Sequence, residues 1–238
     1  MNSVNQNRPS FYFSLRSPYS WLAWHDLVRH HGELVDRLDW RPFFEPDSCS
    51  SALLAEAGGT FPYTPMSKAK SLYILQDVKR LAADRGLSFR WPVDRNPVWE
   101  VPHLAYLVAA RQGRGQDFIV AAARARWQQG LDICDPAVVA SWADELGIDG
   151  AELAGAVDDP VTRAQGVQAL LQIQREGVFG VPFFTVRHEK FWGVDRLAAF
   201  AGALERRRES PDPVPAGAER LGLRRDGSVD DGHAGGCG

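Results

Sequence analysis

The chain has 238 residues, of which 45% are hydrophobic and 24% are charged, and its formal net charge is −3 at pH 7. These values are typical of a globular protein with a sizeable core, and they exclude the basic surface that nucleic-acid binding needs. No apolar run reaches the length of about 18 residues that a membrane span requires. The polar N-terminus lacks a signal-peptide pattern, so we expect a cytoplasmic protein without membrane partners.

The first stretch with a clear pattern is FYFSLRSPYSWL, at residues 11–22, which predicts a strand followed by a helix. Serine caps the free N–H groups of a helix and proline is favoured in its first turn, so the helix begins at Ser17-Pro18. A helix N-terminus suits an anion, because unpaired N–H groups and the positive end of the helix dipole meet there. Two interpretations stay open: Ser17 only caps the helix, or its hydroxyl also faces a ligand.

The first helix is expected over residues 18–31 and a second strand over 38–44, which makes a βαβ unit with parallel strands. The strand signal then disappears until residue 159. Helices are expected in that interval at residues 51–57, 65–85, 102–110, 116–129, 136–146 and 151–157. In the long helix over 65–85, four apolar residues follow helical spacing: Leu72, Leu75, Val78 and Leu81.

The C-terminal part predicts a helix, a hairpin and a last helix. The helix covers residues 160–176, the two strands cover 183–186 and 189–192, and the last helix opens at Asp195. The final residues are rich in proline, glycine and charge, as in a disordered tail. The expected organisation is α/β in three parts: a domain of residues 10–46 and 159–206, a helical insertion of residues 47–158, and a tail of residues 207–238.

Cysteine and histidine residues offer little chemistry. The three cysteines, Cys49, Cys134 and Cys237, are far apart and form no C-x-x-C pair. This spacing argues against a disulfide framework, a zinc ribbon and a dithiol redox site. The six histidines have no metal-ligand spacing with a nearby cysteine or carboxylate, so we expect no metal.

Three motifs carry a resemblance to a known family. Pro182 directly precedes a strand, which is unusual because proline cannot donate to a strand ladder. The motifs SPYSWL at 17–22, FGVP at 179–182 and FWGVDRL at 191–197 closely resemble those of the 2-hydroxychromene-2-carboxylate isomerases. These enzymes belong with the kappa-class glutathione transferases, in the DsbA-like branch of the thioredoxin superfamily. The resemblance covers about residues 10–206 and implies a thioredoxin-like fold with a large all-helical insertion.

The resemblance also implies a set of site residues. Ser17 stands where redox relatives keep the first cysteine of C-x-x-C, and it is the implied catalytic residue. The implied cofactor is glutathione or another low-molecular-weight thiol, held by Lys70, Val181, Pro182, Val194 and Asp195. The substrate is expected beside Asn96, Trp192 and Arg16. The aromatic residues are expected partly in the core and partly around a flat substrate: Trp21, Trp24, Phe43, Phe44, Trp91, Trp99 and Trp192.

The chain departs from the family pattern in three places. An asparagine that helps to hold glutathione in the transferases should lie near residues 58–61, where this chain has Gly-Gly-Thr-Phe. Isomerases of the family often have aspartate where this chain has Ser14, and an apolar residue where it has Arg16. An arginine next to Ser17 is either a surface residue or a positive charge over the thiol site.

The function that the resemblance implies is thiol-dependent cis–trans isomerisation of a small conjugated aromatic or polyene carbonyl compound. A kappa-like glutathione transferase and a non-catalytic thioredoxin-fold binding module are the alternatives. Serine at both positions 17 and 20 argues against dithiol exchange. Family members are commonly dimers, so a homodimer is a further expectation.

Overall fold

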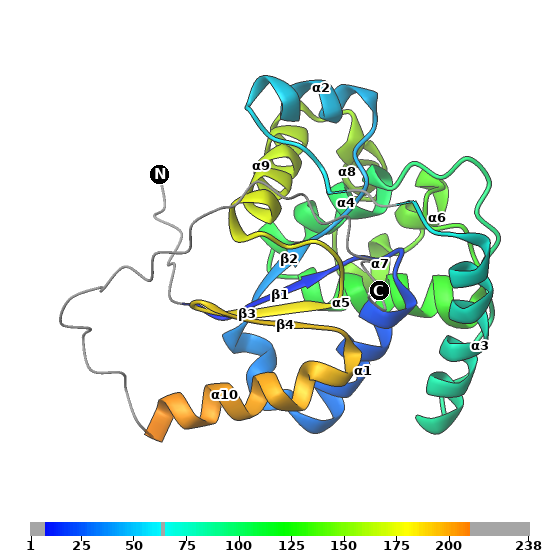
Figure 1. Ribbon diagram of the computed structural model, residues 1–238. Helices are drawn as coiled ribbons and strands as arrows, with labels where there is room; N and C mark the ends of the chain where they lie inside the picture. The colour runs from blue at the N-terminus through cyan, green and yellow to red at the C-terminus, as the bar shows by residue number, and fades with distance from the viewer. Residues whose placement is uncertain (1–7, 63–64, 210–238) are drawn as a thin grey trace, which may run out of the picture.

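The computed structural model describes residues 8–62 and 65–209, with a four-stranded mixed sheet at the centre (Figure 1). Strand β1 (Ser10–Phe13) pairs in parallel with β2 (Asp39–Pro42) and antiparallel with β3 (Phe183–Val186). The fourth strand, β4 (Glu189–Trp192), pairs antiparallel with β3, so the order across the sheet is β2–β1–β3–β4. The predicted βαβ unit and the predicted hairpin are confirmed.

Helix α1 (Pro18–His30) connects β1 to β2 and confirms the helix expected after Ser17. It is followed by a short 3-10 helix, η1 (Gly32–Arg37). Strand β2 ends at Pro42, earlier than the predicted end at residue 44. A single backbone hydrogen bond, from the Phe43 N–H to β1, continues the pairing beyond that point.

Helices cover both faces of the sheet (Figure 1). One face carries α1 and α10 (Leu197–Glu209), and the other carries α4 (Glu100–Arg111) and α9 (Pro160–Glu176). Stacked rings hold the sheet to α10. Phe11 of β1 stacks on Phe184 of β3, with ring centroids 4.6 Å apart, and Phe200 of α10 stacks on Phe184 at 4.9 Å. All three side chains are completely buried, and such aromatic pairs add stability beyond the burial of their area.

Between β2 and α9, the regular structure of the described residues is entirely helical, as expected for the insertion. Besides α4, it consists of these elements: α2 (Ser48–Glu56), α3 (Lys68–Asp84), α5 (Gly115–Ala123), α6 (Pro136–Ala140), α7 (Ala143–Leu146), α8 (Gly150–Ala154), the π-helical turn η2 (Arg124–Gln129) and the 3-10 turn η3 (Gly155–Val157).

Four predicted helices differ in detail from the structure. The helix expected over 136–146 is split into α6 and α7, the helix expected over 116–129 changes from α5 to the π-helical turn η2, and the helix expected over 151–157 changes from α8 to the 3-10 turn η3. The last helix starts with a 3-10 turn, η4 (Val194–Arg196), before α10 begins. Local apolar spacing does not distinguish a continuous helix from such interrupted ones.

The insertion and the sheet share one core. A continuous cluster of buried residues runs from Phe11 and Phe184 through Leu104 and Val108 of α4 to Leu153 of α8. Such sharing means that the insertion buries its apolar side chains together with the sheet. The division into an N- and C-terminal domain and an insertion domain stays a prediction about the chain's organisation.

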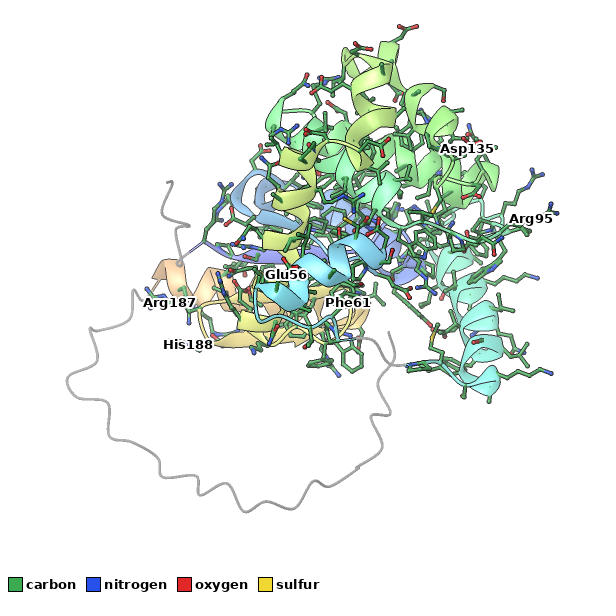
Figure 2. The ribbon with its side chains drawn as sticks, turned by 90° about the horizontal axis from the view of Figure 1, so that it is seen from above. Glu56, Phe61, Arg95, Asp135, Arg187 and His188 are labelled. Atoms are coloured by element: carbon green, nitrogen blue, oxygen red, sulfur yellow. The ribbon has the colours of Figure 1, made fainter. Side chains whose placement is uncertain are left out.

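Helix α3 stands to one side of the other helices, and Arg95, on the segment that follows it, points away from the molecule (Figure 2). The buried face of α3 differs from the predicted apolar stripe. Ile74, Val78 and Ala82 are buried, whereas Leu72 and Leu75 are 51% and 39% exposed. Helical spacing predicts which residues share a face, but it does not tell which face the neighbouring α1 covers.

The C-terminal boundary also needs a correction. Helix α10 continues to Glu209, so residues 207–209, expected in the tail, are helical. The rest of the expected tail, residues 210–238, lies outside the described residues. None of the helices in residues 8–62 and 65–209 has the length and apolar character needed to cross a bilayer.

A buried polar cluster ties three helices of the insertion side together. Nη1 of Arg163, on α9, donates to Oε2 of Glu100 at 2.9 Å and to both carboxylate oxygens of Asp47 at 3.0 Å. Asp47 caps α2 by accepting the Ser50 N–H, and Glu100, fully buried, opens α4. Burial and the neighbouring Asp47 raise the pKa of Glu100 to about 7. Burial opposes ionisation of Asp47, but its hydrogen bonds with Glu100, Ser50 and Arg163 hold the pKa of Asp47 below its ordinary value.

We therefore expect Glu100→Gln to change the pH dependence of stability. A pKa raised on folding gives stability that is present below the unfolded value and lost as pH rises through about 7. The amide cannot ionise, and Asp47 still balances Arg163. From pH 5 to pH 8, the free energy of unfolding of the variant should rise relative to wild type by about 1–3 kcal/mol. Urea unfolding at a series of pH values measures this, with Glu152→Gln, at an exposed position, as control. If the free energy of unfolding of both variants followed pH as in wild type, the expectation would be contradicted.

Candidate active site

Ser17 lies at the N-cap of α1, at the end of the turn that leaves β1. Its Oγ accepts the Ser20 N–H at 3.2 Å, and its own N–H donates to the Ser14 carbonyl at 3.1 Å. The capping role predicted for Ser17 is therefore confirmed. Because the cap bond uses a lone pair of Oγ, the hydroxyl proton can still be donated to a ligand.

Ser17 also lines a cavity of about 340 Å³. The walls come from the β1–α1 turn, the segment after β2, the start of α3, the loop before α4, the turn η2, the loop before β3 and the end of β4. Five of the predicted site residues line it together: Arg16, Ser17, Lys70, Val181 and Trp192. These residues are up to 176 positions apart in the chain, so the fold rather than local sequence assembles them.

The other four predicted site residues do not line this cavity. Pro182 is buried behind Val181, to which it is joined by a cis peptide bond. Val194 packs against the cluster of Tyr19 and Val78, beside the cavity. The side chain of Asp195 is 67% exposed and pairs with Arg196 at 3.5 Å. Asn96 is exposed on the loop before α4, with a positive φ of 49°.

The loop before β3 offers backbone groups to the cavity. Among the described residues, the N–H and C=O of Val181 take part in no hydrogen bond, so they can pair with an extended ligand. Gly180 lets Trp192 approach this loop closely, because a Cβ on Gly180 would lie 3.0 Å from the Trp192 Nε1. That Nε1 is buried and has no hydrogen-bond partner within the described part of the chain. The loop therefore combines unused backbone groups with an unused indole donor.

Aromatic rings form much of the cavity wall. Four of the predicted aromatic residues line it, namely Phe43, Phe44, Trp91 and Trp192, and Phe61, Trp127 and Phe179 join them. Phe61, within the segment where the family pattern has an asparagine, packs on Phe43 with ring centroids 4.9 Å apart. Residues 58–61 thus contribute an aromatic ring to the cavity wall.

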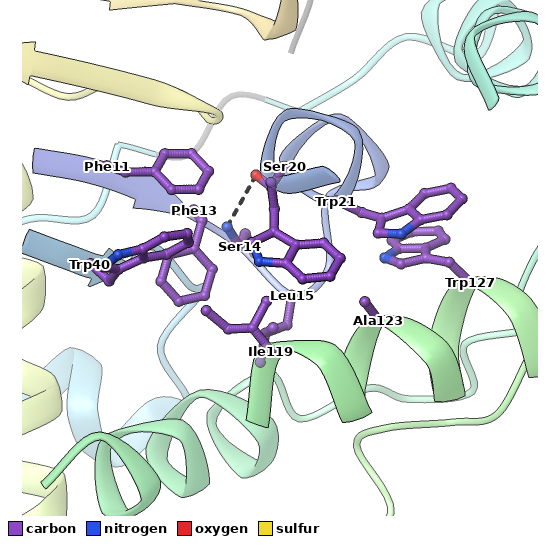
Figure 3. A pocket seen from close by; sticks show the side chains of 11 residues that line it. Phe11, Phe13, Ser14, Leu15, Ser20, Trp21, Trp40, Ile119, Ala123 and Trp127 are labelled. Atoms are coloured by element: carbon purple, nitrogen blue, oxygen red, sulfur yellow. Dashed lines mark hydrogen bonds between the residues drawn. The ribbon is translucent and has the colours of Figure 1, made fainter. Parts of the chain in front are cut away.

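The remaining predicted aromatic residues belong to the packing behind the site. Trp99 is buried, while Trp21 and Trp24 line a second cavity of only about 20 Å³ behind the β1–α1 turn (Figure 3). Trp21 stacks on Trp127 there, with centroids 5.9 Å apart. A space of this size holds about one water molecule, so this cavity is a packing gap and not a substrate site.

His103, which sequence patterns do not single out, fixes the β1–α1 turn. It is completely buried on α4, and its Nε2 accepts the Leu15 N–H at 3.0 Å and lies 3.3 Å from the Ser14 Oγ. Its Nδ1 lies 2.6 Å from the carbonyl oxygen of Trp99 and must carry the proton, since Nε2 accepts a backbone N–H. Burial above all, with the nearby Arg126 and Arg16, lowers the pKa of His103 to about 3, although the hydrogen bond with the Trp99 carbonyl opposes this shift.

A second unpredicted pair, Arg126 and Asp94, forms part of the cavity wall. Nη1 and Nη2 of Arg126 donate to the two carboxylate oxygens of Asp94 at 2.7 and 2.9 Å. The Arg126 side chain is only 3% exposed, and its Cζ lies 4.8 Å from the ring centre of Trp99 and 4.7 Å from that of Trp127. Arg16 also lies over Trp99, at 5.3 Å, and pairs with Glu45 at 2.9 Å.

The comparisons with known proteins agree with this architecture. A family model described as a DSBA-like thioredoxin domain matches residues 10–205. The chain belongs to this family. The resemblance predicted from the three motifs and the thioredoxin-like fold with a helical insertion are thereby confirmed.

Two curated relatives and one solved structure are similar to this DSBA-like chain. The 2-hydroxychromene-2-carboxylate isomerase of Sphingobium xenophagum is 29% identical over 191 residues, which are 79% of this chain and 92% of the relative. Human glutathione S-transferase kappa 1 is 24% identical over 226 residues, covering 88% of this chain and 96% of the relative. A structure of selenomethionine 2-hydroxychromene-2-carboxylate isomerase has a TM-score of 0.65 at 22% identity, covering 85% of this chain and 98% of that one.

His103 makes the stability of this DSBA-like chain fall as the pH becomes acidic. Because folding lowers its pKa from 6.5 to about 3, the unfolded chain takes up the proton first. The stability is present above about pH 6.5 and is lost as pH falls toward 3. We expect a loss of about 2 kcal/mol between pH 6.5 and pH 5 from this residue, at about 1.4 kcal/mol per pH unit. Urea unfolding between pH 5 and pH 6.5 measures this loss. His103→Gln should make the free energy of unfolding less dependent on pH, and His188→Gln, at an exposed position, should not. An equal pH dependence in both variants would contradict the assignment to His103.

Proposed function

We propose that the chain is a thiol-dependent cis–trans isomerase that acts on a small conjugated aromatic or polyene carbonyl compound. The observation that carries this proposal is the position of Ser17, whose hydroxyl meets an aromatic-walled cavity at the N-terminus of α1. The proposed cofactor is glutathione or another low-molecular-weight thiol. A cytoplasmic location and a homodimer stay predictions from the sequence.

The residues around Ser17 fit a peptide thiol. Lys70, in the first turn of α3, offers a point charge for a carboxylate, and the Val181 backbone groups suit an extended peptide. When bound, the thiol would supply a sulfur nucleophile that adds to a conjugated double bond and leaves again after rotation, so that it is not consumed. The protein's task is then to hold the sulfur as a thiolate and to hold the substrate flat beside it.

Ser17 would serve as a donor to the thiolate. An ordinary thiol has a pKa of about 8.5, and a helix N-terminus stabilises an anion by about 0.3–1 kcal/mol, or about 2 when partly buried. At about 1.4 kcal/mol per pKa unit, the helix alone lowers a thiol pKa by about one unit. A hydrogen bond from the Ser17 hydroxyl adds to that effect, because bonds to charged groups are stronger than neutral ones.

Ser17 is not placed to act as a nucleophile itself. A serine nucleophile needs a base within hydrogen-bond reach of its hydroxyl. The buried histidine of this region, His103, accepts the Leu15 N–H and bonds to the hydroxyl of Ser14 instead. This histidine is therefore occupied with holding the turn, and in our proposal the reactive sulfur comes from the cofactor.

A kappa-like glutathione transferase is the second candidate, favoured by the similarity to the human kappa 1 protein over 88% of this chain. A non-catalytic binding module is the third.

We expect turnover of 2-hydroxychromene-2-carboxylate, or of a related conjugated carbonyl compound, with the amount of free glutathione unchanged. Substrate absorbance and a thiol titration follow both quantities. Loss of free thiol in step with loss of substrate would favour the transferase. If the amounts of substrate and thiol both stay constant, the result would favour the binding module.

We expect Ser17→Ala to raise the pKa of the bound thiol by about one unit or more, because a charge-assisted hydrogen bond is lost. Calorimetric titration with glutathione measures binding, and the ultraviolet absorbance of the thiolate against pH measures the pKa. Ser17→Asn is the matched control for stability, because asparagine also caps a helix but offers no hydroxyl. An unchanged thiol pKa in Ser17→Ala would contradict the role of Ser17, and no binding to wild type would contradict the choice of cofactor.

A further inference from the structure

We infer that Arg16 is a catalytic residue, which stabilises the negative charge that develops on the carbonyl oxygen of the substrate. The inference rests on the proposed function, since it concerns the substrate in the same cavity. It starts from a position at which the chain departs from the family pattern, directly before Ser17. Arg16 lines the cavity together with Ser17, so a cation stands in the wall beside the proposed place of the sulfur.

The proposed isomerisation places a negative charge on oxygen for a short time. When a nucleophile adds to a double bond that is conjugated with a carbonyl group, its electron pair forms the new bond to carbon. The pair of the double bond moves toward the carbonyl carbon, and the carbonyl pair moves onto the oxygen. Departure of the nucleophile after rotation returns all three pairs, so no proton, electron or further reactant is consumed. A donor already in place at this oxygen lowers the barrier, because it binds the charged oxygen more strongly than the neutral carbonyl group.

The guanidinium of Arg16 has donors to offer this oxygen. Arginine carries five N–H donors, and Glu45 is the one acceptor that the described residues provide for this side chain, with 2.9 Å between Nη1 and Oε2. The Arg16 side chain is 42% exposed, so its remaining donors can reach a ligand in the cavity. Arg126 differs in this respect, because Asp94 occupies both of its Nη atoms and only 3% of its side chain is exposed.

Contacts within the protein orient this guanidinium before a ligand arrives. Its Cζ lies 5.3 Å from the ring centre of Trp99, and Glu45 holds Nη1 from the segment after β2. The backbone N–H of Arg16 donates to the Ser14 Oγ at 3.3 Å, which fixes the start of the side chain. An ion pair as exposed as that of Arg16 and Glu45 adds little to stability, so a stabilising role does not account for it. A donor that is already oriented needs no reorganisation when the charge appears.

The place of Arg16 in the β1–α1 turn suits an oxygen close to the reacting carbon. The carbonyl oxygen and the attacked carbon belong to one conjugated system, so only a few bonds separate them. The donor to the sulfur and the donor to this oxygen should therefore be close neighbours. Ser17 and Arg16 are adjacent in the chain and line the same cavity. Lys70 comes from α3, and under the proposed function it meets the carboxylate of the thiol instead.

The test measures the affinity of the cavity for a negatively charged oxygen, without a thiol and without turnover. The probe is 4-nitrophenol, a flat aromatic compound whose hydroxyl group ionises near neutral pH and whose anion absorbs visible light. Titration of the bound probe with pH, followed by absorbance, gives its pKa on the protein. We expect this pKa to lie about one unit below that of the free probe, because the phenolate should bind about tenfold more tightly than the phenol. An unchanged pKa, or no saturable binding, would overturn the inference.

Three variants locate the charge that causes the shift. Arg16→Met should return the pKa of the bound probe to its free value while the ring of the probe still binds. The matched control Arg95→Met removes the same charge from the loop before α4, where the side chain points away from the molecule (Figure 2), and should keep the shift. Glu45→Gln should lower the pKa of the bound probe further, because a competing negative charge is gone, and it decides the matter if Arg16→Met does not fold. In the isomerisation assay, Arg16→Met should lower kcat rather than raise KM, because the charge exists only during the reaction.

The outcomes separate this inference from the proposed function. A shift that persists in Arg16→Met would assign the charge to Lys70 or Arg126 and overturn the inference, as would an unchanged pKa in Glu45→Gln or an unchanged kcat in Arg16→Met. If glutathione binds and its thiol pKa responds to Ser17→Ala while the probe does not respond to Arg16→Met, the inference fails and the proposed function stands. If no glutathione binds while the pKa of the probe depends on Arg16, the proposed cofactor is refuted and the oxyanion site remains.

Discussion

The site depends on one buried neutral imidazole. His103 gives its Nδ1 proton to the carbonyl of Trp99 and receives the Leu15 N–H on Nε2, so a single ring joins α4 to the turn that carries Ser17. Phe44 stacks on the same ring, with centroids 5.1 Å apart. A charged imidazolium could not accept the Leu15 N–H, so the turn keeps this shape only while His103 stays neutral. Burial ensures that neutrality.

Two arginines place positive charge around that imidazole, Arg126 buried and Arg16 partly exposed. Arg16 and Arg126 both lie against Trp99, the residue whose carbonyl holds His103. Each arginine is paired with a carboxylate, so the desolvation cost is limited. The positive charge of the two guanidinium groups still disfavours a proton on His103. The same positive charge favours an anion near the N-terminus of α1. One arrangement therefore keeps the turn in shape and favours an anion beside it, as the proposed thiolate requires.

Sequence patterns predicted the parts of this structure that depend on neighbours in the chain. The strand, the Ser17 cap and the helix after it are local, and each was predictable from about a dozen residues. Leu15 and His103 are 88 positions apart, and nothing around His103 indicates that it accepts a backbone N–H. Arg126 looks like a charge on the solvent face of a helix until η2 and Trp99 enclose it. The motif resemblance selected five residues that line one cavity, whereas Asn96 is exposed on the loop before α4, two positions from the lining residue Asp94; the roles of all of them stay predictions.

The positions of Val194 and Asp195, outside the cavity, are compatible with their predicted role. A tripeptide thiol and a flat substrate together need more room than about 340 Å³ leaves once walls and charges are satisfied. The turn η4 contacts α1, and Val194 packs beside Tyr19, two residues after Ser17. A thiol with its sulfur at Ser17 and its backbone along Val181 would therefore extend out of the cavity toward η4. The cavity would then hold mainly the sulfur and the substrate, which accounts for its aromatic walls.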